Sequence, residues 1–91
     1  MRVEKEFIMR EVGGEHIIVP VGESALEFNG LITVNEVGVF LWNLLQKDVT
    51  LDDLVKAVLN EYEVEEDVAR KDVQEFLDIL IKANILVADK D

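Results

Sequence analysis

Few residues of this chain have side chains suited to covalent or acid–base chemistry. Its 91 residues include a single histidine, His16, and no cysteine. Without cysteine, the chain has no disulfide, no thiolate nucleophile and no cysteine-ligated zinc. Ser24 lies outside a G-x-S-x-G motif, so we interpret it as a turn residue. We interpret His16 as a structural or surface residue of a strand, and we predict no catalytic constellation.

Acidic residues are adjacent to one another at two places, residues 52–53 and residues 65–67. Neighbouring residues at a helix start point in different directions, and their spacing differs from that of a calcium loop. We therefore interpret both groups as capping and solvated residues rather than metal ligands. The glycines Gly13, Gly14 and Gly22 match neither G-x-G-x-x-G nor a P-loop, so no nucleotide site is predicted. We expect neither a metal nor a cofactor.

The charge balance disfavours two classes of partner. The chain carries 20 acidic and 9 basic residues, which gives a formal net charge of −11. This excess repels phosphate backbones and anionic lipid, so we expect neither nucleic acid nor a membrane as partner. No apolar run approaches the roughly 20 residues that span a bilayer, and residues 1–10 lack the apolar centre of a signal peptide. Together with the lack of cysteine, these features predict a cytoplasmic protein.

The first part of the chain has the patterning of strands. Its length and its hydrophobic fraction of 49% suit one domain over residues 1–91. Residues 7–12 and 16–19 flank a Gly-Gly turn signal and predict a β-hairpin. Pro20 lacks an N–H, so we expect it at a strand end or on an edge. Residues 22–29 predict a loop, and residues 31–34 predict a third short strand.

From Asn35 onward the hydrophobic period is that of helices. Asn35 suits the N-cap of a first helix. Gly38 costs that helix about 1 kcal/mol relative to alanine, which a close approach of neighbouring atoms would offset. Thr50 begins a second helix, and Asp53 completes an arrangement like a capping box.

A third helix is predicted over residues 65–83, with Asn84 as its C-cap. Residues 85–88 form a short apolar run that predicts either a final strand or a packed tail. The whole order predicts an α+β fold, in which a three-stranded antiparallel sheet is followed by a three-helix bundle similar to a winged helix-turn-helix.

This similarity makes a winged-helix DNA-binding transcriptional regulator an alternative function. The candidate recognition helix, residues 65–83, contains six acidic and three basic residues, so its net charge is 3 − 6 = −3. A helix that enters the major groove normally has the opposite balance. The likeness of fold therefore does not carry DNA binding with it, and a gel shift at low salt would test the alternative.

The third predicted helix carries more apolar surface than a single core-facing stripe. Val68 and Ile79 lie to one side of the main stripe, with Asp72 between them, and that stripe consists of Ala69, Val73, Phe76, Leu77 and Leu80. Two interpretations follow: the helix is covered on both sides, or the flank of Val68, Asp72 and Ile79 lines a groove.

The third predicted strand is an edge if the sheet is a meander. An edge strand has free N–H and C=O groups that accept an added strand. An edge beside an apolar helix flank is the geometry of β-augmentation, in which a peptide binds as an extra strand. The same edge also permits a homodimer by strand or helix exchange. A short edge with no partner is the plainer interpretation.

Several segments in order resemble the PqqD family. Residues 33–42, TVNEVGVFLW, resemble its signature L-N-E-T-G-x-x-I/L-W, with Val37 in place of the usual threonine. Residues 50–54, TLDDL, match its next helix start. The segments EYEV at 61–64 and ARKDVQEFL at 69–77 resemble its E-Y-D-V and A-x-x-D-V-x-x-F-L segments. The resemblance covers about residues 30–87.

The resemblance implies a non-catalytic peptide chaperone, or recognition element, for ribosomally synthesised and modified peptides. Such proteins present a precursor's leader peptide to a modifying enzyme, often a radical S-adenosylmethionine protein, in coenzyme PQQ, sactipeptide and lasso peptide pathways. The leader would add as a strand beside the third strand and pack against the third helix. Carried over to this chain, the peptide contacts are Leu31, Ile32, Thr33, Val34, Val68, Lys71, Asp72, Glu75 and Ile79.

Overall fold

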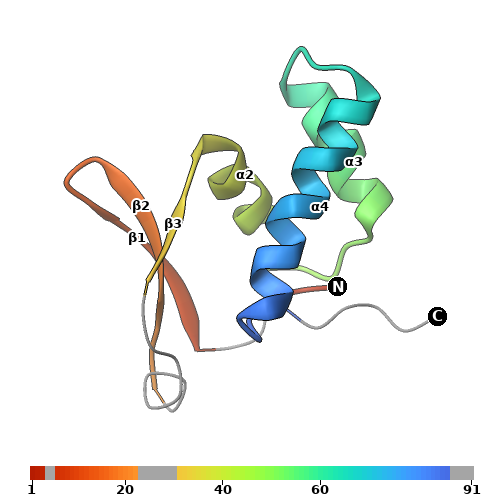
Figure 1. Cartoon of the computed structure of the whole chain (residues 1–91). Helices are drawn as coiled ribbons and strands as arrows, with labels where there is room; N and C mark the ends of the chain where they lie inside the picture. Colours follow the sequence, from red (N-terminus) through yellow and green to blue (C-terminus); the bar gives the residue numbers. More distant parts are fainter. Residues whose placement is uncertain (4–5, 23–30, 87–91) are drawn as a thin grey trace.

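Three strands precede three helices in the computed structural model, which describes residues 1–3, 6–22 and 31–86 (Figure 1). This order confirms the predicted α+β fold. Apart from Gly22, the loop predicted over residues 22–29 lies outside the described residues, and so does the end of the apolar run at 85–88. None of the helices in the described segments has the length and hydropathy of a membrane span.

The sheet is an antiparallel meander with the order β1-β2-β3. Strands β1 (Phe7–Val12) and β2 (Glu15–Pro20) form the predicted hairpin, in register from Phe7 opposite Pro20 to Val12 opposite Glu15. The two turn residues, Gly13 and Gly14, have φ angles of 58° and 85°, which glycine adopts without steric cost. Pro20 is the last residue of β2, as its missing N–H predicts.

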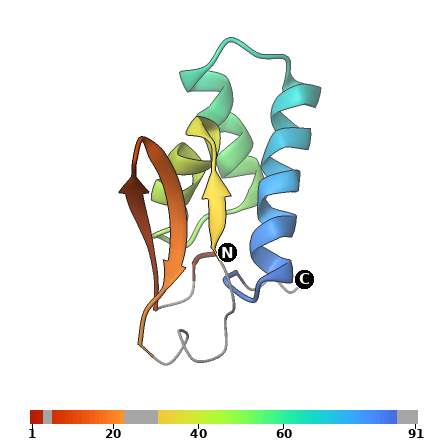
Figure 2. The same cartoon turned by 60° about the vertical axis from the view of Figure 1, so that its left-hand side comes forward.

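Strand β3 (Ile32–Val34) is an edge of this sheet. It pairs with β2, so that Ile32 lies opposite Ile18 and Val34 lies opposite His16. In both views β3 is the strand nearest to helix α4 (Glu66–Lys82), and the hairpin lies beyond it (Figure 1, Figure 2). The geometry that the sequence suggested, an edge strand beside the last long helix, is therefore present.

Helix α2 (Glu36–Leu44) follows β3 directly, and its start explains the glycine at position 38. The Asn35 side chain caps the helix, because its Oδ1 accepts a hydrogen bond of 2.8 Å from the Gly38 N–H. A Cβ atom on Gly38 would overlap the Val34 side chain and lie 3.1 Å from Cε1 of Phe76 in α4. The predicted close approach is confirmed, and it brings β3, α2 and α4 together at one point.

Helices α3 (Leu51–Glu61) and α4 run side by side in opposite directions (Figure 1, Figure 2). The predicted capping box is confirmed: the Asp53 N–H donates to Thr50 Oγ1 at 3.1 Å, and the Thr50 N–H donates to Asp53 Oδ2 at 3.0 Å. Helix α4 ends one residue earlier than predicted, with Ala83 as its C-cap. Asn84 follows in the left-handed region with a φ of 61°, a conformation that asparagine tolerates.

The core lies between the inner face of the sheet and the helices. Helix α4 contributes its predicted stripe, of which all but the half-buried Phe76 is fully buried, and β2 and β3 contribute Ile18 and Val34. The apolar run after α4 packs and also pairs: Ile85 and Leu86 are buried, and Leu86 forms an antiparallel bridge with Val3. Residues 85 and 86 therefore connect the C-terminal end of α4 to the core.

Candidate functional site

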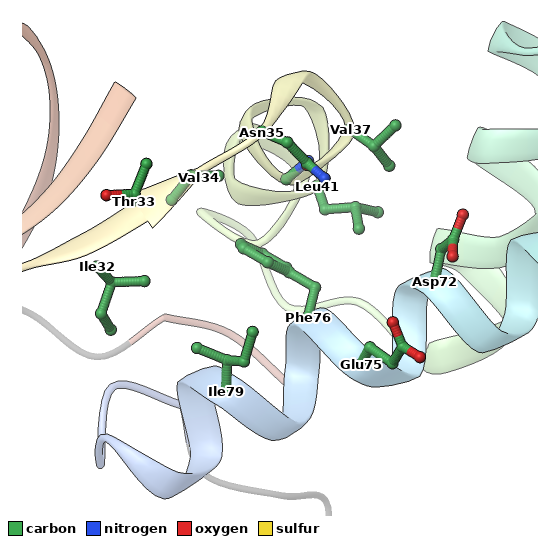
Figure 3. Close-up of a pocket in the computed structure, with 11 residues that line it drawn as sticks. Ile32, Thr33, Val34, Asn35, Val37, Leu41, Asp72, Glu75, Phe76 and Ile79 are labelled. Atoms are coloured by element: carbon green, nitrogen blue, oxygen red, sulfur yellow. The ribbon is translucent and has the colours of Figure 1, made fainter. Parts of the chain in front are cut away.

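A groove of about 210 Å³ lies between β3, the start of α2 and one side of α4 (Figure 3). It is the feature of the described surface that joins the edge strand to the flank of the last helix. The residues that line it are Ile32, Thr33, Val34, Asn35, Val37, Gly38, Leu41, Asp72, Glu75, Phe76 and Ile79.

The floor of the groove is apolar and depends on Gly38. Val34 and Leu41 are buried, and the half-buried ring of Phe76 rises between β3 and α2 (Figure 3). The side chains of Val34 and Phe76 can pack against the α2 backbone at Gly38 because residue 38 has no side chain. The glycine therefore costs helix propensity but provides a continuous apolar surface that joins strand to helix.

The α4 wall of the groove consists of Asp72, Glu75, Phe76 and Ile79. Their spacing of three, four and seven residues places them on one side of the helix. Ile79 is 48% exposed, although it is a large aliphatic residue. Of the predicted flank, Asp72 and Ile79 line this groove and Val68 does not.

The opposite wall is the edge of β3. Among the described residues β3 has a ladder partner on one edge only, β2, so no strand pairs with the edge that faces α4. The side chain of Ile32 points toward Ile79, whereas the side chain of Thr33 points to the other face of the strand (Figure 3). In the alternating hydrogen-bond pattern that the two-residue turn sets, Ile32 and Val34 bond to β2, so the N–H and C=O of Thr33 point away from β2. A strand laid in the groove would therefore meet the backbone of Thr33 and the side chain of Ile32.

The polar groups of the α4 wall are negatively charged. Asp72 and Glu75 are both exposed, and within the described segments neither carboxylate has a hydrogen bond or an ion pair. None of the described residues that line the groove is basic. Lys71, the base nearest in sequence, is exposed on α4 outside the lining.

Four of the other acidic residues that the sequence singles out, Asp52, Asp53, Glu66 and Asp67, have structural partners outside the groove. Asp53 belongs to the capping box, and the hydrogen bond from the Thr50 backbone lowers the pKa of its carboxyl group. Asp52 and Glu66 each lie 3.4 Å from Arg70. The Asp67 side chain accepts a hydrogen bond from the Val68 N–H. The interpretation of these acids as helix-terminal residues agrees with these contacts.

The structure brings together part of the predicted contact set. The residues of that set that line the groove are Ile32, Thr33, Val34, Asp72, Glu75 and Ile79. Leu31, Val68 and Lys71 are exposed but do not line it. Val68, 46% exposed, lies on the same side of α4 one turn before Asp72, so it extends this face toward the α3–α4 turn.

Sequence reasoning missed the lining residues that α2 supplies, together with Asn35 and Phe76. Phe76 was assigned to the core stripe of α4, and it does pack toward the core while leaving part of its ring at the groove. The signal that could have found them was Gly38, because a glycine inside a helix indicates that another element approaches there. Its neighbours in space could not be read from sequence alone.

Comparison with known proteins supports the resemblance. The family model described as "Coenzyme PQQ synthesis protein D (PqqD)" matches residues 15–86. A comparison with curated protein sequences gives no match. The fold is similar to a solved structure of TbiB1 in complex with the TbiA(beta) leader peptide, with a TM-score of 0.76, 20% identity and 100% of both chains covered.

It is also similar to lasso peptide synthetase B1 complexed with the leader peptide, with a TM-score of 0.72, 17% identity and 96% of both chains covered. At these identities the two structures establish a common fold. The family model matches most of the chain, because residues 15–86 include β2, β3 and all three helices. This protein therefore belongs to the PqqD family.

Proposed function

We propose that this protein is a non-catalytic peptide chaperone. It binds the leader of a ribosomally synthesised precursor peptide and presents that precursor to a modifying enzyme. The observation that carries the proposal is the groove between β3 and α4, where a strand edge that has no partner among the described residues lies beside an exposed isoleucine and a half-buried phenylalanine. The fold of the chain and its family support this choice of occupant.

Binding would occur by β-augmentation. The leader adds as a fourth strand, and its main chain forms hydrogen bonds with the outward-facing groups of β3. Side chains on one face of the added strand point into the groove and pack on Phe76 and Ile79, while the alternate ones face solvent. The backbone bonds provide affinity for any extended peptide, and the groove side chains provide selection among peptides.

Another polypeptide would catalyse the modification of the precursor peptide. The polar side chains that line the groove are Thr33, Asn35, Asp72 and Glu75, which do not form a nucleophile paired with a base. The modifying enzyme would act on the core of the precursor while the leader remains bound here. A radical S-adenosylmethionine enzyme is one such partner, and its cluster ligands would be supplied by its own chain. We place this encounter in the cytoplasm, where the precursor is synthesised.

A titration followed by NMR tests the proposal. Isotope-labelled protein is titrated with a synthetic leader peptide taken from a precursor gene adjacent to the gene for this chain. The amide shifts are expected to change for residues 31–34 and for residues 68–79, with smaller effects elsewhere. Shifts confined to β1, or to α3 and the α3–α4 turn, would reject the groove as the binding site.

A further inference from the structure

We infer that the groove selects peptides in which a basic side chain stands two residues before a large aliphatic one, in the N-to-C direction. This requirement rests on the proposed function, since it assumes that an extended peptide occupies the groove. It adds the charge, spacing and order of the peptide side chains, which strand addition alone leaves open. Three features of the groove lead to it.

The first feature is the charge of the α4 wall. Asp72 and Glu75 line the groove without a hydrogen bond or ion pair to any other described residue, and no base lines the groove with them. The chain as a whole carries a net charge of −11, which adds a repulsive background for acidic peptides. A lysine or arginine at this place gains two partners, whereas an aspartate or glutamate is repelled by both.

The second feature is the polarity along the groove. Its other end is formed by Ile79 and Ile32, whose side chains face each other across the gap beside the ring of Phe76 (Figure 3). Ile79 leaves 48% of its surface exposed. A leucine, isoleucine or similar side chain would remove that apolar surface from water. The groove therefore has an acidic end and an apolar end.

The distance between these ends sets the spacing of the peptide residues. Glu75 and Ile79 are four residues apart on one helix face, which corresponds to about 6 Å along the axis. Two residues of an extended strand cover about 6.8 Å, and residues two apart point to the same face. A basic side chain beside Glu75 and an aliphatic one beside Ile79 are therefore separated by one residue of the peptide.

The third feature is the direction of β3, which sets the order. Strand β3 begins at Ile32, opposite Ile79, and leads into α2 at the end where Asp72 lies (Figure 3). Both ladders of the sheet are antiparallel, and antiparallel pairing is the more stable arrangement per residue. An antiparallel fourth strand enters at the acidic end and leaves at the apolar end, so the basic residue comes first.

A peptide-display selection on the full chain tests the order without a known ligand. A library of random 12-residue peptides is selected on the immobilised protein, with the Ile79→Asp variant as the background. Enrichment of basic-x-aliphatic sequences is expected. Enrichment of apolar peptides without a basic residue, or with the reverse order, would overturn this inference and leave the proposed function standing. A selection with no enrichment above the variant would overturn both.

A double variant that removes both negative charges then tests the two carboxylates. The affinity of Asp72→Asn/Glu75→Gln for a selected basic-x-aliphatic peptide is expected to fall about three- to tenfold at low salt, and less at high salt. The control Glu61→Gln/Glu63→Gln makes the same change of net charge at exposed positions outside the groove. An equal loss in both double variants would show a general charge effect and refute the role of the groove carboxylates.

Discussion

The two long faces of α4 contrast in what covers them. On one face, Ala69, Val73, Leu77 and Leu80 are at most 2% exposed. On the other face, Asp72 and Glu75 are exposed and Ile79 is half exposed beside an open strand edge. Both faces follow the same helical period, so the apolar pattern alone does not separate them. The covered face holds the fold together, whereas the uncovered face has surface left for another molecule.

This difference separates stability from recognition within one helix. A fully buried leucine contributes about 1.5–3 kcal/mol from the removal of apolar surface, and its deletion also leaves a cavity. A half-exposed isoleucine recovers only part of that free energy until something covers it. Substitutions on the covered face should therefore lower the free energy of unfolding, whereas substitutions on the uncovered face should lower peptide affinity.

Leu77→Ala on the covered face should lower the free energy of unfolding by about 2–5 kcal/mol. Leu77 is 2% exposed and belongs to the core cluster, so its removal leaves space that the surroundings fill only in part. Urea denaturation followed by circular dichroism measures this loss. The matched control is Ile79→Ala on the other face, which should cost less than about 1 kcal/mol. Similar losses in the two variants would abolish the distinction between the faces.

Gly38→Ala should lower both the free energy of unfolding and the peptide affinity, because β3 and α4 both contact α2 at Gly38. Alanine improves helix propensity by about 1 kcal/mol, but its Cβ would overlap Val34 and press on Phe76, so the net loss of stability should be about 1–3 kcal/mol. Peptide affinity should also fall, since Val34 and Phe76 line the groove. Denaturation and peptide titration of the same sample give both values.

The control for this variant is Gly14→Ala in the hairpin turn. No atom lies within 4 Å of a Cβ built there, but the φ of 85° disfavours any residue with a side chain. The variant should lose stability and keep the peptide affinity of its folded fraction. Loss of affinity in Gly14→Ala, or unchanged affinity in Gly38→Ala, would disprove the link between Gly38 and the groove.

Ile79→Asp on the uncovered face should reduce leader affinity at least tenfold, while it lowers the free energy of unfolding by only about 1 kcal/mol, less than the loss in Leu77→Ala. The substitution removes the apolar surface on which an aliphatic side chain of the peptide would pack. It also places a second carboxylate near Glu75, at the end of the groove that is otherwise apolar. Isothermal titration calorimetry and urea denaturation measure the two quantities. Val64→Asp, at a similarly exposed valine outside the groove, should leave both nearly unchanged. Equal binding by wild type and Ile79→Asp would contradict the assignment of this face.

Thr50→Ala should remove about 1 kcal/mol of stability and leave peptide affinity unchanged, because it breaks the capping box of α3 far along the chain from the groove residues. Part of its effect should depend on pH. The backbone hydrogen bond from residue 50, which alanine keeps, and then the bond to the Thr50 side chain, which alanine removes, lower the pKa of Asp53 below its ordinary value of 3.8. A lowered pKa contributes stability that is present above the ordinary value and lost as pH falls through the lowered one.

The difference in Tm between wild type and Thr50→Ala should therefore shrink as pH is taken below about 4. Thermal unfolding at several pH values between 2 and 7 measures this difference. The change should be small, since Asp53 is at the surface and its interactions are screened by solvent. A difference that grows toward low pH would contradict this account of the cap.

The sequence predicted the elements well because their signals are local. Gly13 and Gly14 determine the hairpin, Asn35 and Thr50 determine two helix starts, and the regular period of α4 determines its buried stripe. Each signal acts through neighbours within a few residues along the chain. The predicted edge strand and the exposed flank of α4 follow from the same patterns.

The detail of the groove was less accessible because it depends on packing between distant residues. Phe76 faces both the core and the groove, and only its position against Gly38 and Val34 shows this. Periodicity placed Val68 and Ile79 on one flank, but the groove extends along α4 only from Ile79 to Asp72 and leaves Val68 outside its lining. The length and placement of β3 relative to α4 are tertiary features, so the lining by α2 could not be predicted.

Amide hydrogen exchange of residues 31–34, measured with and without a saturating leader peptide, tests strand addition at β3. Because successive N–H groups of a strand alternate in direction, at least one of these amides faces away from β2 toward the groove. Its exchange should slow by about tenfold or more when the peptide adds as a strand. A peptide that binds but leaves the exchange of all these amides unchanged would contradict strand addition at β3.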